Sequence, residues 1–286
     1  MPTTDPWKTS TSLAPEKLIE PSLELHWAAQ FLASVGQTFA EPSDDDSHRA
    51  MEWDPQRRAF VSSPFAGAYP FRVGLRPEDL TLLLLDRTPE ALGSLPLAGK
   101  TRDEGYEWLS LGLATYMGGA PPIIERPEFD IPEHPVGDRT PFSSAYTDEH
   151  RALAALYGGS SEILGELVAG RDDAAPIRCW PHHFDLATLL TVATDADGSA
   201  TSTVGVGLAP MGGGYESWYW YVTPWPYPDP SALPELTGAG GWHTEGWTGA
   251  VLTGEEIVKL DEAARRQAVQ SFVKEAVETA TRALTG

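Results

Sequence analysis

The chain has 286 residues, enough to bury a sizeable core as one large domain or two small ones. Its hydrophobic fraction of 41% is typical of a soluble globular protein, and no apolar run approaches the ~20 residues of a membrane helix. The 41 acidic residues outnumber the 20 basic ones, and the formal net charge of -21 repels phosphate backbones and anionic lipid. We therefore expect neither nucleic-acid binding nor binding to a membrane surface.

The first residues, 1–7, contain no basic region leading into an apolar stretch, so no signal peptide is predicted. A single cysteine, Cys179, excludes an intramolecular disulfide and is typical of a reducing cytoplasm. Together these features predict a cytoplasmic protein. Residues 1–20 are polar and contain several prolines, and we expect them to form a flexible N-terminal arm.

Four helices are predicted from apolar residues spaced three and four positions apart. Two of them start with capping boxes, Thr101 with Glu104 and Thr253 with Glu256. The last helix carries one long apolar stripe and is expected to lie across a sheet with that stripe inward. The expected helices cover residues 21–36, 101–117, 147–170 and 253–284.

Strands are predicted where short apolar or alternating runs are separated by turns rich in Gly, Pro and Asp. Their order relative to the helices is similar in both halves, so the expected fold class is α+β, with antiparallel sheets covered by helices. A two-fold repeat of helix, strands and helix is one interpretation, although no residue-level repeat is visible. The first two strands are expected to form a hairpin connected at residues 54–56. The expected strands cover residues 48–53, 59–61, 71–73, 79–86, 177–192, 201–208, 218–222 and 242–252.

Residues 118–142 contain six prolines and no clear periodicity. Repeated prolines remove backbone donors and favour extended chain, which indicates a linker or a strap. As a linker, this segment would join half-domains 21–117 and 143–286. As a strap, it would hold together a single compact domain of residues 21–286. Its apolar members favour a segment that lies along the surface.

Two stretches combine histidine with carboxylates. Residues 178–187 contain His182, His183 and Asp185 within a predicted buried strand, and residues 241–247 contain His243 and Glu245. Because side chains alternate along a strand, His183 and Asp185 are expected on one face and His182 on the other. His243 and Glu245 are expected to share a face in the same way. If the two strands lie side by side, both histidine–carboxylate pairs converge on one site.

Two imidazoles and two carboxylates suit a divalent metal such as zinc, iron or manganese. The metal ligands would be His183, Asp185, His243 and Glu245, but no short-range metalloenzyme motif is present. The same four side chains equally suit a metal-free catalytic site, in which a carboxylate fixes the tautomer of a histidine acid–base catalyst. A purely structural role is the third interpretation.

Aromatic residues are concentrated near these stretches and predict either a core or the walls of a ligand pocket. The preferred function is a small-molecule-binding protein, with enzymatic activity left open. The alternative is a non-catalytic interaction protein that uses its aromatic surface and has structural histidines. The predicted ligand-binding residues are Trp180, His182, Trp218, Trp220, Trp242 and Trp247.

Several of these motifs resemble those of a bacterial protein family that has no established activity. The resemblance rests on residues 180–185, 220–226 and 241–247, together with 25–27 and 45–48. It extends from about residue 22 to the end of the chain. The run Phe184–Ala187 is more distantly similar to another bacterial domain of unknown function. The resemblance implies a compact bacterial protein and assigns no catalytic residues.

Overall fold

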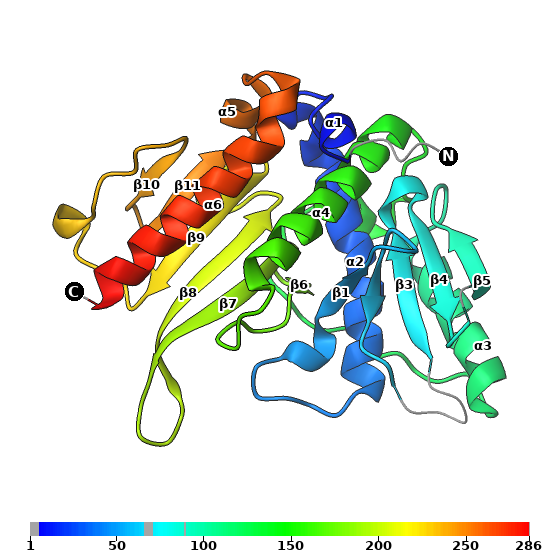
Figure 1. Ribbon diagram of the computed structural model, residues 1–286. Coiled ribbons are helices and arrows are strands. Elements are labelled where there is room, and N and C mark those ends of the chain that lie inside the picture. The colour runs from blue at the N-terminus through cyan, green and yellow to red at the C-terminus, as the bar shows by residue number, and fades with distance from the viewer. Residues whose placement is uncertain (1–5, 66–70, 89, 286) are drawn as a thin grey trace. The chain divides into compact units, whose positions relative to one another are not determined.

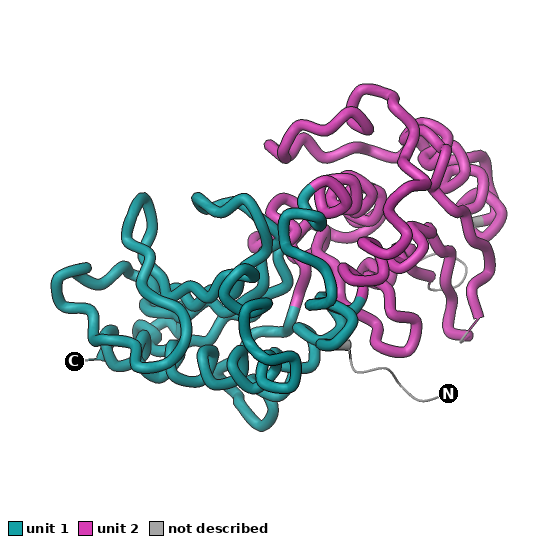
Figure 2. The backbone as a smooth tube through the Cα atoms, turned by 90° about the horizontal axis from the view of Figure 1, so that it is seen from above, with its two compact units in different colours: residues 1–19, 155–177, 185–286 teal, residues 20–154, 178–184 magenta. Residues whose placement is uncertain are grey.

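The computed structural model describes residues 6–65, 71–88 and 90–285, and the chain divides into two compact units. Unit 1 comprises residues 1–19, 155–177 and 185–286, and unit 2 comprises residues 20–154 and 178–184 (Figure 2). Each unit combines helices with an antiparallel sheet, which confirms the predicted α+β class. No helix of the described residues combines the length and apolar character needed to cross a membrane.

The sheet of unit 2 has the strand order β6-β1-β2-β3-β4-β5, and every neighbouring pair is antiparallel. The predicted hairpin is confirmed, with Met51 opposite Ser62 and Asp54 opposite Ala59. Sequence patterning did not predict β5, whose residues are mostly exposed and offer little apolar alternation. The strands are β1 Met51–Asp54, β2 Ala59–Ser62, β3 Arg72–Arg76, β4 Thr81–Leu85, β5 Ala91–Pro96 and β6 Arg178–Trp180.

The helices of unit 2 include α2 (Ile19–Phe39) and α3 (Arg102–Met117), together with the start of α4 (Thr147–Val168). The predicted capping box of α3 is present, because Thr101 accepts from the backbone of Glu104 and the Glu104 side chain accepts in return. Short 3-10 turns occur at η2 Ser47–Arg49, η3 Pro77–Asp79 and η4 Pro135–Asp138.

The proline-rich segment 118–142 lies within unit 2 and is bound along its length by side chains of α2 and α3. Ser110 donates to the carbonyl of Pro122 at 2.6 Å, and the Trp27 indole donates to the carbonyl of Pro132 at 3.0 Å. The prolines keep this segment out of helices and sheets, so its backbone carbonyls accept hydrogen bonds from side chains instead.

The sheet of unit 1 has the order β10-β11-β9-β8-β7 and is also antiparallel throughout (Figure 1). Trp220 and Val222 are fully buried, whereas Tyr219 and Tyr221 alternate with them and lie on the other face. The strands are β7 Asp185–Thr194, β8 Ala200–Ala209, β9 Tyr219–Trp225, β10 Gly241–His243 and β11 Gly249–Thr253.

The predicted C-terminal helix is divided into α5 (Gly254–Val258) and α6 (Glu262–Thr285). The capping box of Thr253 and Glu256 is present at the start of α5. Helix α6 lies across β8 and β9 with its apolar stripe, including Phe272, buried (Figure 1). Unit 1 also contains the rest of α4 and the 3-10 turn η5 (Pro230–Ala232).

The N-terminal stretch differs from the predicted flexible arm wherever the structure describes it. Residues Pro6–Ser10 form α1, and Pro15–Leu18 form the 3-10 turn η1. Trp7 is 2% exposed and Leu18 is 1% exposed, so this stretch contributes to a core. This stretch is ordered because burial of these two apolar side chains stabilises it. The polar, proline-rich composition around them did not predict that burial. Residues 1–5 lie outside the described residues.

Two predicted strands are wrong in their continuity. The strand expected at 177–192 is interrupted by a turn at 181–184, and the strand expected at 242–252 is a hairpin of β10 and β11. Pro181 has no backbone N–H to donate to a ladder, and Gly246 has the positive φ of 82° that its turn requires. Both interruptions fall inside the stretches predicted to carry the site.

Candidate functional site

A buried polar clamp on α2 fixes the turn at residues 181–184. His26 Nε2 and Gln30 Nε2 each lie 2.8 Å from the carbonyl oxygen of Pro181, and both side chains are 4% exposed. Residues four apart on a helix share a face, so both reach the same acceptor. A carbonyl only accepts, so Nε2 of His26 carries a proton. Burial lowers the pKa of His26 to about 4, which keeps this imidazole neutral at pH 7.

The turn places Phe184 in the left-handed backbone region, with φ of 56°. This conformation costs roughly 1–2 kcal/mol for a residue with a side chain, and a bulky residue adopts it only when its surroundings hold it there. The Phe184 ring is fully buried, with its centroid 5.4 Å from Phe60 and 5.3 Å from the His26 ring. Packing and the clamp together offset the strain.

The turn brings the two adjacent histidines together, so the prediction that they face opposite ways is wrong. Their ring centroids are 4.3 Å apart, with His183 exposed and His182 half-buried between Trp180 and Phe129. Strand alternation does not apply, because residues 181–184 are not in a strand. Burial lowers the pKa of His182, and the neighbouring His183 lowers it further.

Asp185 begins β7 in unit 1 and is 9% exposed. The Tyr221 hydroxyl donates to its Oδ2 at 2.5 Å. Tyr221 reaches across β8 at Gly207, where a Cβ atom would lie 2.8 Å from the tyrosine hydroxyl. The absence of a side chain at Gly207 therefore permits the bond between β9 and β7.

His243 ends β10 and has partners on both ring nitrogens. Its Nδ1 lies 3.2 Å from the Tyr215 hydroxyl, and its Nε2 lies 2.8 Å from the backbone oxygen of Glu245. The carbonyl requires Nε2 to be the protonated nitrogen, so Tyr215 donates to Nδ1. The predicted sharing of a strand face by His243 and Glu245 is wrong, because Glu245 lies in the turn between β10 and β11 and its side chain is exposed.

The predicted tryptophan wall is distributed over different environments. Trp218 is 1% exposed and Trp220 is 0% exposed, so neither has surface to offer a ligand. Trp242 donates to the carbonyl of Pro234, and Trp247 donates to the carbonyl of Gly213 while stacking on His243. Trp218 and Trp220 are therefore core residues.

Among the described residues, no group of three or more His, Cys, Asp or Glu side chains is arranged to hold a metal ion. A ligand set of His183, Asp185, His243 and Glu245 for zinc, iron or manganese thus has no geometric support. Asp185 and His243 each form a hydrogen bond with a tyrosine instead.

A histidine–carboxylate pair that sequence patterning did not predict lies beside a cavity of about 480 Å³ in unit 2. Helix α2 contributes Glu24, and the first turn of α4 contributes His150. Glu24 is 1% exposed and His150 is 4% exposed. The cavity is lined by Arg76, Glu78, Asp79, Leu80, Ala98, Ser143, Ser144, Tyr146, Thr147, His150 and Arg151.

The facing atoms of this pair are buried without a hydrogen-bonding partner. Glu24 Oε2 and His150 Nε2 lie 3.6 Å apart, and neither bonds to any described residue. The other oxygen of Glu24 accepts the backbone N–H of Ser143, which fixes the carboxyl group. Native structures rarely leave buried polar atoms unsatisfied, and each exception calls for a functional or structural reason.

Burial perturbs both groups of the pair toward their neutral forms. It raises the pKa of Glu24 to about 7, against a smaller lowering by the Ser143 backbone, and it lowers the pKa of His150 to about 4. A group whose proton affinity is strongly perturbed beside a cavity is a candidate for acid–base chemistry. The sequence did contain a signal, because Glu24 lies four residues before the buried Ala28 and His150 lies four before the buried Ala154. Each is a polar residue on the apolar face of its helix.

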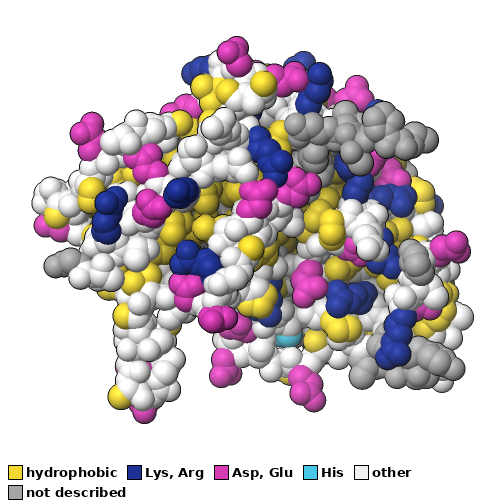
Figure 3. All heavy atoms as spheres, in the orientation of Figure 1, with side chains coloured by type: hydrophobic (Ala, Val, Ile, Leu, Met, Phe, Trp, Pro, Cys, Tyr) yellow, Lys and Arg dark blue, Asp and Glu magenta, His cyan; other side chains and the backbone are white. Residues whose placement is uncertain are grey.

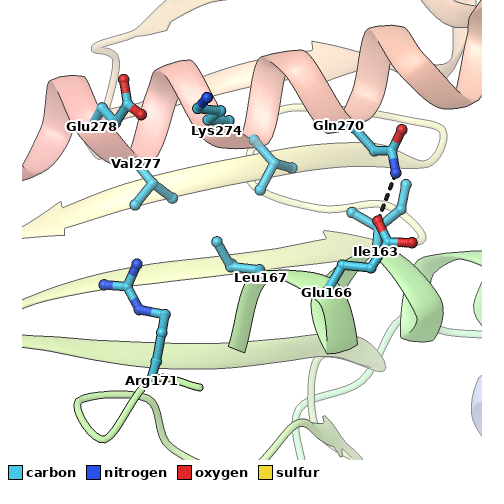
Figure 4. A pocket seen from close by; sticks show the side chains of 9 residues that line it. Ile163, Glu166, Leu167, Arg171, Gln270, Lys274, Val277 and Glu278 are labelled. Carbon is cyan, nitrogen blue, oxygen red and sulfur yellow. Dashed lines mark hydrogen bonds between the residues drawn. The ribbon is translucent and has the colours of Figure 1, made fainter. Parts of the chain in front are cut away.

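A second cavity, of about 360 Å³, lies in unit 1 between α4 and α6 (Figure 4). Its apolar lining is visible between these helices in Figure 3, bordered by side chains of both charges. Glu166 at its edge accepts from Gln270 at 2.6 Å and pairs with Arg266 at 2.8 Å. The titratable residues of this cavity are exposed, so it offers no buried acid–base group. The lining residues are Ile163, Glu166, Leu167, Arg171, Gln270, Val273, Lys274, Val277 and Glu278.

Comparisons of the chain with protein-family models, with curated proteins and with solved structures found no match.

Proposed function

We propose that the protein binds a small polar molecule in the unit 2 cavity and exchanges a proton with it through His150. The observation that carries this proposal is the pair of buried, unpartnered atoms, Glu24 Oε2 and His150 Nε2, beside that cavity. Small-molecule binding is also the function preferred from the sequence, but the residues proposed to carry it are different.

The pair has the arrangement of an acid–base dyad. Nε2 of His150 faces Glu24, so Nδ1 is the ring nitrogen available to a ligand in the cavity that His150 lines. The neutral imidazole accepts a proton from the ligand on Nδ1. Glu24, which is ionised above its raised pKa of about 7, then stabilises the resulting imidazolium ion as a carboxylate. The separation of 3.6 Å shortens to a hydrogen bond when that positive charge forms, because catalytic hydrogen bonds are often long without a ligand.

The cavity selects polar ligands by its lining. Hydroxyl groups come from Ser143, Ser144, Tyr146 and Thr147, and the rim carries two arginines and two carboxylates. Such a lining offers many hydrogen-bond donors and acceptors beside an apolar part, so ligands with several hydroxyl, amino or carboxyl groups fit best.

Ligand binding is tested by screening hydroxy acids, amino acids, sugars and nucleosides against protein labelled with ¹³C and ¹⁵N at histidine. A binding compound is expected to move the ring signals of His150 and to raise the Tm. Ser144→Trp fills the cavity from an exposed lining position and should abolish both effects, whereas the exposed control Ala232→Trp should retain them. Compounds that stabilise Ser144→Trp as well as the wild type, or a panel that never moves the His150 signals, would contradict the proposal.

A second candidate function is protein interaction through exposed aromatic residues of unit 1. Trp225 is 58% exposed and Tyr227 is 46% exposed, with their ring centroids 5.1 Å apart. Exposed aromatics are enriched where proteins meet their partners. Under this function, the double variant Trp225→Ser/Tyr227→Ser loses binding to the partner protein and Ser144→Trp retains it. These variants therefore distinguish the two candidate functions.

A further inference from the structure

Three tyrosines of unit 1 form a chain of neighbouring rings. The centroids of Tyr215 and Tyr219 are 4.6 Å apart, and those of Tyr219 and Tyr221 are 6.3 Å apart. The middle ring is 6% exposed, whereas the two outer rings are half-buried and reach the surface. The chain is therefore accessible at both ends and protected in its centre.

Each outer tyrosine donates its phenolic proton to a base. Tyr215 donates to Nδ1 of His243, because Nε2 of that ring is protonated and held by the carbonyl of Glu245. Tyr221 donates to the carboxylate of Asp185. The middle residue, Tyr219, differs: burial, with the nearby charge of Asp185, raises its pKa to about 12, so it retains its proton.

This pattern matches what one-electron oxidation of a phenol requires. A phenol that loses an electron becomes a strong acid and must also lose its proton. A hydrogen-bonded base can accept that proton in the same step, which makes the oxidation easier than for a phenol without a base. Tyr215 and Tyr221 meet this condition through His243 and Asp185.

We propose that Tyr215 and His243 form a redox-active pair that reacts with small one-electron oxidants, such as radicals or high-potential metal complexes. The oxidant takes one electron from Tyr215, and the phenolic proton moves to Nδ1 of His243. The products are a neutral tyrosyl radical, an imidazolium ion and the oxidant reduced by one electron. This activity is independent of the proposed unit 2 site, with which it shares no residue.

The tyrosine chain also provides a route by which the radical can move from Tyr215 to Tyr221. In the second step an electron moves from Tyr221 through Tyr219 to the Tyr215 radical. Tyr221 loses its proton to Asp185, and Tyr215 recovers its proton from His243. Charge and protons balance, because each outer tyrosine exchanges its proton with its own base.

The proposal is tested on the full chain by flash oxidation with photogenerated tris(bipyridine)ruthenium(III), recording tyrosyl radicals by transient absorption and electron paramagnetic resonance. His243→Gln, which cannot accept the proton, should slow radical formation about tenfold at pH 7, as expected for loss of a hydrogen bond to a base. Tyr215→Phe should remove the fast phase. Circular dichroism of each variant identifies any that fails to fold.

The control is Tyr227→Phe, because Tyr227 is 46% exposed and no described residue accepts its proton at hydrogen-bonding distance. This variant should retain the fast phase. A folded His243→Gln protein that forms radicals at the wild-type rate would overturn the proposal. So would loss of the fast phase in Tyr227→Phe, because an exposed tyrosine without a hydrogen-bonded base would then be the oxidised residue. If His243→Gln does not fold, Tyr215→Phe decides alone, and an unchanged fast phase in it refutes the pair.

Discussion

The buried Glu24–His150 pair predicts an unusual dependence of stability on pH. Burial raises the pKa of Glu24 from 4.5 to about 7 and lowers that of His150 from 6.5 to about 4. Each change corresponds to about 3 kcal/mol, at about 1.4 kcal/mol for every tenfold change in proton affinity. The two groups act on the unfolding free energy in opposite directions.

The signs follow from proton uptake. Between pH 4.5 and 7 the folded state holds a proton on Glu24 that the unfolded state has released, so this residue makes stability fall as pH rises. Between pH 4 and 6.5 the unfolded state protonates His150 and the folded state does not, so His150 makes stability rise. In the wild type the two slopes cancel between about pH 4.5 and 6.5.

Single substitutions should reveal the contribution of each residue to the pH dependence of the unfolding free energy. Relative to the wild type, Glu24→Gln should gain about 3 kcal/mol of unfolding free energy as pH rises from 4.5 to 7. His150→Gln should lose a similar amount as pH rises from 4 to 6.5. Denaturant unfolding at half-unit pH steps measures both differences, and subtracting the wild type removes the contribution of the other acidic residues.

Two controls sharpen this test. The exposed Glu16→Gln variant removes one negative charge without burial, and its difference from the wild type should show a much smaller slope. The double variant Glu24→Gln/His150→Gln should again run parallel to the wild type between pH 4.5 and 6.5. A difference curve for Glu24→Gln that falls with rising pH would refute the reasoning, because it would mean that the pair is an ionised salt bridge in the folded protein.

Three further predictions concern backbone and packing. Arg139 has φ of 71° and is exposed, so Arg139→Gly should raise the unfolding free energy by about 0.5–1 kcal/mol in denaturant titration. Gln30→Leu removes one of the two donors to Pro181 and should cost about 1–3 kcal/mol, measured in the same way. Gly207→Ala places a Cβ against the Tyr221 hydroxyl and a backbone oxygen, so thermal unfolding should show a loss of about 1–3 kcal/mol.

The predictions for Arg139 and Gly207 each have a matched control. Arg139→Ala keeps the unfavourable backbone conformation and should bring no gain. Gly165→Ala adds the same methyl group as Gly207→Ala, but within α4 and with nothing within 4 Å, so it should stabilise by up to about 1 kcal/mol. Equal effects of the two alanine substitutions would show that contact with Tyr221 is not the cause.

Local signals in the sequence predicted those parts of the fold that local physics determines. Thr101 and Thr253 cap helices with the glutamates three residues later, because both halves of a capping box lie within one turn. The hairpin around Asp54 was predicted for the same reason, since its carboxylate bonds to the backbone of the next residues. The helix and sheet class followed from these elements.

Tertiary contacts decided what sequence patterning could not predict. The interruption at Pro181 depends on His26 and Gln30, which lie far away in the sequence. Without knowledge of that clamp, the apolar run on either side favours one continuous strand. The same limitation hid the Glu24–His150 pair, because only the packing of α2 against α4 within unit 2 brings these two residues together.

Hydrogen-bond satisfaction separates structural histidines from the functional candidate. His26 and His150 are both buried with a pKa of about 4, so neither burial nor proton affinity distinguishes them. His26 donates to Pro181, and His243 has partners on both ring nitrogens, so a ligand would have to break an existing bond to use any of those nitrogens. His150 is the histidine whose buried ring nitrogen bonds to no described residue. When the ring takes a proton on Nδ1, the N–H at Nε2 gains the Glu24 carboxylate as its acceptor, and this new hydrogen bond favours proton uptake by the ring.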